Sequence, residues 1–277
     1  MTQILNNKEQ SGANLEGVNL QGAVLREYDL TGAKLANANL KGAFLCDTRL
    51  NLADLTGANL TGALLLRTDL TGVTLKGADF SAVTLTDSTL AGADLTGADL
   101  TEVNLTAINL TAINLTGANL TGGAILRDAD LTGADLTGAD LTRVNLARAN
   151  LTGATLTSAN LTRATLTSVN LTRADLTGAT LTKVKLTEAN LAGANLAGAD
   201  LWEGNLTGAT LTGANLTGAN LLGANFTGVN LTGANFAGAN LTGANLTGAN
   251  LTGATLTEAN LTAANLYGTC LYSPKVK

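Results

Sequence analysis

The chain has 277 residues, with 21 acidic and 16 basic side chains, no histidine and a net charge of −5. This mildly acidic balance argues against non-specific binding to nucleic acid and against an anionic membrane surface as a partner. Apolar runs reach only about four residues, at 63–66, whereas a membrane span needs roughly 20, and the first ten residues lack the basic start and apolar core of a signal peptide. We therefore expect a cytoplasmic protein with no membrane partner and no direct binding to nucleic acid.

The side chains needed for several kinds of catalysis are missing. Without histidine, and with Cys46 and Cys270 near opposite ends of the chain, zinc sites and Ser-His or Cys-His nucleophile systems have no ligands or base. The interior of a small solenoid is filled by its own side chains, which leaves no room for a substrate. The sequence therefore predicts no enzyme, no metal, no cofactor and no small-molecule substrate.

A five-residue repeat runs through the chain, most regularly from Leu206 to Leu256, with Ala-Asn-Leu-Thr-Gly at residues 214–218 as a typical unit. Five residues turn an α-helix by about 140°, so the leucines would form no stripe, and on a flat strand they would alternate between faces. Each unit must therefore contain a short extended segment and a bend. We expect Leu and the preceding Ala to face inward, and Asn or Asp, Thr and Gly to face outward, with Gly suited to the bend.

This pattern resembles the pentapeptide-repeat family, whose consensus is A(N/D)LXX, and the match runs from Leu15 to Leu271. The resemblance implies an all-β fold, a right-handed quadrilateral parallel β-helix of about 13 coils with four pentapeptides each, and no fixed biochemical activity. Characterised members resemble either regulators that act through protein contacts or DNA mimics that inhibit type II topoisomerases such as gyrase. The interleaved acids and bases make this chain a poor copy of duplex DNA. A non-enzymatic interaction scaffold or regulator is therefore the favoured hypothesis, and a DNA-mimic inhibitor is the alternative.

In chain order, residues 1–12 lie outside the repeat and are expected to form a tail or cap. A single β-helix is expected over residues 13–271, followed by a C-terminal tail at 272–277. On this fold Cys46 and Cys270 lie more than about 50 Å apart, too far for a disulfide, so we expect free thiols in a reducing compartment.

Four units in the first half lose both the Ala and the Gly of the consensus, at residues 26–30, 46–50, 66–70 and 86–90. Their spacing of twenty indicates four pentapeptides per coil, because it places all four on one side of the coil. Outward columns then form ion-pair ladders, and Thr48, Thr68 and Ser88 point inward with hydroxyls that must bond to backbone or to each other. The outward columns are Glu27, Asp47, Arg67 and Asp87, and Asp29, Arg49 and Asp69.

The same spacing predicts an apolar column of Val24, Phe44 and Leu64 at outward positions where the consensus has Asn or Asp. Cys46 and Leu66 lie around the corner from it. An apolar centre with a polar rim is typical of an interface, for a protein partner or a second copy; alternatively, the N-terminal tail covers the column. The expected rim residues are Arg26, Asp47, Arg49, Arg67 and Asp69. Trp202 and Leu222 form a weaker second patch.

The repeat slips once, because Leu120 and Leu131 are eleven residues apart. One residue is therefore inserted near 121–131, either at Gly122-Gly123 or within a six-residue unit at 126–131. Both alternatives predict a bulge with the coil continuing through it.

Overall fold

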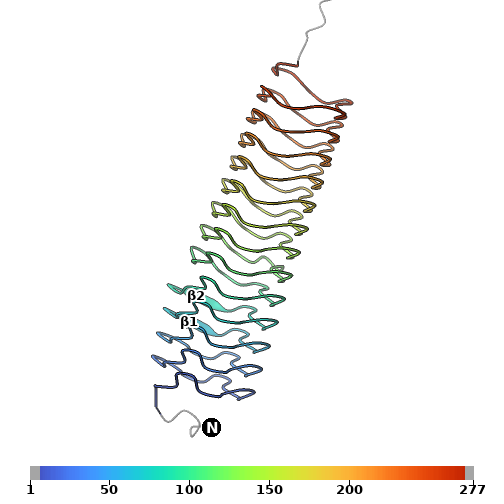
Figure 1. The fold of residues 1–277 in the computed structure, drawn as a ribbon. Coiled ribbons are helices and arrows are strands. Elements are labelled where there is room, and N and C mark those ends of the chain that lie inside the picture. Colours follow the sequence, from blue (N-terminus) through green and yellow to red (C-terminus); the bar gives the residue numbers. More distant parts are fainter. Residues whose placement is uncertain (1–6, 272–277) are drawn as a thin grey trace, which may run out of the picture. The chain divides into compact units, whose positions relative to one another are not determined.

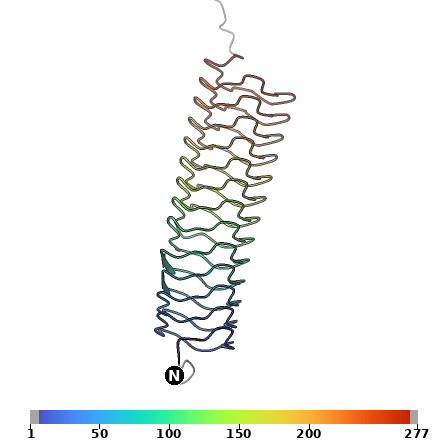
Figure 2. The ribbon, with the colours of Figure 1, turned by 60° about the vertical axis from the view of Figure 1, so that its left-hand side comes forward.

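The computed structural model describes residues 7–271, so residues 1–6 and 272–277, which include the expected C-terminal tail, lie outside the described part. The chain forms two compact units, Met1–Asp140 and Leu141–Lys277. Within each unit, successive turns of the chain lie one above the next (Figures 1 and 2). A single β-helix that spans both units stays a prediction.

Each unit is an all-β, right-handed quadrilateral parallel β-helix, as expected. Parallel bridges join residues twenty apart, for example Glu9 to Asp29 and Asn225 to Asn245, so four pentapeptides make one coil. Among the described residues only β1 (Leu64–Leu66) and β2 (Thr84–Thr86) are longer than one bridge. They pair in parallel, with Leu65 opposite Leu85, in the first unit (Figure 1).

The corners explain the Leu-Thr-Gly-Ala spacing. At a typical corner Ala33 N donates to Leu30 O at 3.0 Å, and Gly32 between them has φ of 62°. A positive φ at this position defines a type II turn, which glycine enters without a steric cost. Gly32 N then donates to Asn51 O of the next coil at 3.0 Å. Other residues also take this conformation, for example Arg163 at 59°, and each accepts a cost of about 1 kcal/mol.

Stacked leucines and alanines fill the interior, and the outward Asn or Asp closes each corner. Asn170 Oδ1 accepts from Thr172 N at 3.1 Å and from Thr172 Oγ1 at 2.6 Å. Asp175 makes the same two bonds to Thr177, and the hydroxyl bond is the main reason that the pKa of Asp175 is lowered. The consensus Asn/Asp-Leu-Thr therefore reflects a local side-chain acceptor for the corner N–H.

Both ends of the repeat differ from expectation. Asp29 N donates to Lys8 O and Gln10 N to Asp29 O, both at 2.8 Å, so the coil includes residues 8–12 rather than starting at 13. The reason is that the ladder needs only backbone groups, and Gln10 takes the place of a central leucine. At the other end Leu271 is 41% exposed instead of inward, because residues 267–271 form turns.

The inserted residue lies at the corner formed by Gly122 and Gly123. Asp99 pairs with Asn119, twenty residues on, but Asn104 pairs with Ile125, twenty-one residues on. The register therefore changes before Ile125, which is the first of the two alternatives. Both glycines have positive φ, 72° and 89°, which makes room for the extra residue. The coil continues within the first unit through the bridges at Asp130, Asp135 and Asp140.

Deleting Gly123 should leave a regular corner, with Gly122 in the left-handed conformation followed by Ala124. No atom outside its chain neighbours lies within 4 Å of a Cβ built on Gly123, so little packing is lost. We expect an unchanged far-ultraviolet circular dichroism spectrum and a change of less than about 1 kcal/mol in the free energy of unfolding. A deletion variant that fails to fold would show that closure of the coil requires the insertion.

Candidate interaction surface

The predicted apolar column lies on one face of the first unit. Bridges stack Val24 on Phe44 and Phe44 on Leu64. Val24 is 69% exposed and Phe44 47%, whereas Leu64 is half-buried. Cys46 and Leu66, around the corner, are also half-buried, so the apolar surface is narrower than five fully exposed side chains would make it.

Charged side chains lie around that corner. Arg67 donates to both carboxylate oxygens of Asp47, from Nε at 2.7 Å and from Nη2 at 2.8 Å. Arg26 Nε lies 3.6 Å from Asp47 Oδ2, and the hydrogen bonds from Arg67 are the main reason that the pKa of Asp47 is lowered. Both arginines are exposed and Asp47 is half-buried, so these ion pairs form a solvated rim that adds little to stability and mainly orients the charged groups.

The next face carries the remaining predicted rim residues. Arg49 Nη1 lies 3.2 Å from Asp29 Oδ2, while Asp69 Oδ1 accepts from Thr71 N at 3.0 Å. The predicted stacking of Asp29, Arg49 and Asp69 is confirmed by their bridges. Arg49 pairs with the acid on the preceding coil, and Asp69 closes its own corner.

Buried hydroxyls, as expected, support the face that holds the apolar column. Thr68 Oγ1 donates to Leu45 O at 2.6 Å, and Ser88 Oγ donates to Leu65 O at 2.9 Å. Thr48 Oγ1 makes the corresponding bond to Leu25 O at 2.7 Å. A hydroxyl from the following coil thus donates to each of these carbonyls, and Leu25 O also accepts from Tyr28 N of its own corner at 3.3 Å.

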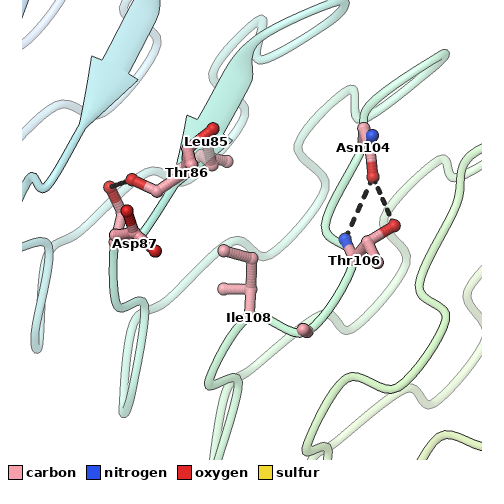
Figure 3. A pocket seen from close by; sticks show the side chains of 8 residues that line it. Leu85, Thr86, Asp87, Asn104, Thr106 and Ile108 are labelled. Atoms are coloured by element: carbon pink, nitrogen blue, oxygen red, sulfur yellow. Dashed lines mark hydrogen bonds between the residues drawn. The ribbon is translucent and has the colours of Figure 1, made fainter.

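A pocket of about 280 Å³ opens where this arrangement stops (Figure 3). The next residue in the column of hydroxyls is Ile108, which has no donor to offer. Among the described residues, Leu85 N and Asp87 N donate no backbone hydrogen bond to the coil above, although Leu45 N and Asp47 N both do so at 2.8 Å. The coils therefore stay in register through the bridge between Thr84 and Asn104, but two of the close backbone hydrogen bonds of the ladder are missing at the pocket.

Sequence reasoning did not predict this pocket. Its lining includes Leu85 and Ile108, together with the polar side chains Thr86, Asp87, Asn104 and Thr106. The sequence did contain one sign of it: the column of inward hydroxyls at Thr48, Thr68 and Ser88 ends at Ile108, which carries no hydroxyl.

The second predicted patch lies in the second unit. Lys183 Nζ is 4.7 Å from the centre of the half-buried Trp202 ring and 3.2 Å from Glu203 Oε2. Glu203 N donates to Leu222 O at 2.9 Å, which places Leu222, 37% exposed, on the coil above. The ammonium group of Lys183 already lies over the Trp202 ring, so less of that ring is free for a partner, and this is the weaker of the two surfaces.

Within residues 7–271, no group of three or more His, Cys, Asp or Glu side chains is placed to hold a metal ion. The same part of the chain contains no helix long and apolar enough to cross a membrane.

Coils of four pentapeptides, closed by type II turns around leucine and alanine, define the class of pentapeptide β-helices. The family model for pentapeptide repeats matches residues 11–45 and then a series of overlapping segments that together cover residues 48–271. The chain therefore belongs to the pentapeptide-repeat family. No curated protein matches the sequence significantly.

Several solved structures are similar to this chain. One is HetL, a pentapeptide repeat protein involved in heterocyst differentiation regulation from the cyanobacterium Nostoc sp. strain PCC 7120, at 36% identity over 76% of this chain and 90% of HetL, with a TM-score of 0.35. Another is Rfr23 from the cyanobacterium Cyanothece 51142, at 45% identity over 31% of this chain and 62% of Rfr23, with a TM-score of 0.20. QnrB1, a plasmid-mediated fluoroquinolone resistance protein, is 22% identical over 78% of this chain and 88% of its own, with a TM-score of 0.34.

Proposed function

We propose that this protein is a non-enzymatic interaction scaffold or regulator, and that it binds a protein partner through the face that carries Val24, Phe44 and Leu64. The observation that supports this most is the stacked, exposed pair Val24 and Phe44 beside an oriented Arg67–Asp47 ion pair. Apolar centres with charged rims are typical of protein interfaces, and arginine is enriched there. Proteins of this family are generally non-enzymatic scaffolds. Two free thiols agree with a place in the cytoplasm.

Inhibition of a type II topoisomerase is the alternative, carried by family resemblance. A DNA mimic needs a dense array of negative charge, because duplex DNA carries one charge per about 1.7 Å. This chain has 21 acids among 16 bases, and two acids beside the proposed face, Asp29 and Asp47, are already paired with arginine. Inhibition of gyrase supercoiling at sub-micromolar protein would favour the alternative over the interaction scaffold.

The double substitution Phe44→Asp and Leu64→Asp tests the proposal. It places two charges in the apolar centre, so binding of a captured protein, or self-association measured by sedimentation, should fall at least about tenfold. Both positions point outward, so the circular dichroism spectrum should not change.

The matched control is Asn225→Asp with Asn245→Asp, which adds two charges to a stacked outward pair in the second unit. Binding should survive in the control. Equal binding by the two double variants would rule out the column as the contact surface.

A further inference from the structure

The pocket lies on the face that carries the proposed contact surface. The bridges that stack Val24, Phe44 and Leu64 continue from Leu64 to Thr84 and from Thr84 to Asn104. At one strand spacing per coil, the pocket begins about 5–10 Å beyond Leu64. A partner that covers the column therefore also reaches the pocket.

Two hydrogen-bond acceptors at the pocket, one of them the exposed Asp87 carboxylate, have no donor within residues 7–271. The carbonyls of Leu25, Leu45 and Leu65 each accept a buried hydroxyl from the following coil. Leu85 O accepts no hydrogen bond among the described residues, because Ile108 stands in the corresponding place. Beside it, the Asp87 carboxylate forms no ion pair within 4 Å in the described part of the chain; Arg67 on the preceding coil interacts with it electrostatically but donates its hydrogen bonds to Asp47.

The same column shows which group fits such a carboxylate. Asp47, two coils earlier, is bound by Arg67, which projects from the corner of the following coil. The residue that follows Asp87 in the column is Ala107, whose short side chain leaves that position open. Arg127 lies above Thr106, one residue out of this column, and within the described residues it forms no ion pair with Asp87; its buried Nε has no hydrogen-bond partner.

We propose that this pocket binds the guanidinium group of an arginine side chain from the protein partner. Arginine supplies several N–H donors in a planar array, enough for the Asp87 carboxylate and the Leu85 carbonyl together. Leu85 and Ile108 give the pocket apolar walls for the methylene groups of the side chain (Figure 3). Its volume of about 280 Å³ is just below the roughly 300–1,000 Å³ of small-molecule sites, which suits one side chain rather than a cofactor. This inference rests on the proposed function for the identity of the partner as a protein.

The test uses N-acetyl-arginine amide as the probe and the neutral, isosteric N-acetyl-citrulline amide as its control. Titration of the ¹⁵N-labelled full chain should give saturable amide shifts at Leu85, Asp87 and Asn104 with the arginine probe and not with the citrulline probe. Asp87→Asn should weaken binding of the arginine probe about tenfold, since a charge-assisted hydrogen bond is replaced by a neutral one. Asn tolerates the left-handed conformation that Asp87 adopts, with φ of 53°, so this variant keeps the corner.

A second variant fills the pocket with an arginine side chain of the protein itself. Ala107→Arg should place a guanidinium over Asp87 as Arg67 lies over Asp47, and should abolish binding of the arginine probe. Arginine already occupies the equivalent left-handed corner at Arg67, with φ of 50°. Equal shifts with the two probes, or unchanged affinity in both variants, would overturn the proposal. The Phe44→Asp, Leu64→Asp protein should still bind the arginine probe, so failure of the contact surface and failure of the pocket are distinguishable.

Discussion

Replacing Phe226 by alanine is expected to lower the free energy of unfolding of the second unit by about 3–5 kcal/mol. Phe226 and Phe236 are fully buried, and their rings meet edge to face with centroids 6.3 Å apart and planes at 79°. Ten residues are half a coil, so the rings approach each other from opposite sides of the interior. Removal of one ring leaves a cavity that stacked coils cannot close without breaking their ladders.

Phe226→Leu is the matched control, since leucine occupies the equivalent position in most coils and should cost less than about 1.5 kcal/mol. In a double-mutant cycle with Phe226→Ala and Phe236→Ala, the two rings should show a coupling free energy of about 0.5–1.5 kcal/mol, in addition to the effect of the buried apolar area that each substitution removes. Guanidinium unfolding of the single and double variants measures these values. An alanine variant as stable as the leucine variant would contradict close packing of the two rings.

The second large effect is expected from Thr68→Val, which keeps the shape of the side chain and removes its hydroxyl. Leu45 O would lose its 2.6 Å bond and remain buried without a donor. Such an unsatisfied group costs about 1–3 kcal/mol, so the first unit should lose that much stability in urea unfolding. Thr68→Ser keeps the donor and should recover most of the loss. If valine and serine variants are equally stable, the hydroxyl column does not support this face.

Most of the fold follows from periods in the sequence. A period of five excludes both helix and flat strand, and the spacing of twenty among residues 26–30, 46–50, 66–70 and 86–90 gives the number of pentapeptides per coil. The columns of Asp29, Arg49 and Asp69 then follow from register alone. Register also gave the inward hydroxyls of Thr68 and Ser88.

Features that depend on backbone pairing were not predictable in this way. The start at Lys8 rests on N–H and carbonyl groups that any residue supplies, so the side-chain pattern missed it. The position of the insertion depended on which corner tolerates an extra left-handed residue, and Gly122-Gly123 is one of two candidates in the sequence.

The sequence predicted which residues form the candidate site, but it did not predict how exposed each side chain is. Register places Val24, Phe44 and Leu64 together, but neighbouring coils cover Leu64 more than Phe44. The pocket at Leu85 was missed because it arises from the loss of ladder bonds between coils whose corners differ in type.

The contact surface can be tested most directly through the two thiols of the chain. Cys46 is half-buried beside the apolar column, whereas Cys270 is exposed on the last described coil. Alkylation of the free protein and of the captured assembly, followed by mass spectrometry, gives the rate at each thiol. The proposal predicts that Cys46 becomes strongly protected in the assembly while Cys270 reacts at its free rate. Alkylation of Cys46 at the free rate in an intact assembly would contradict the claim that this face is the contact surface.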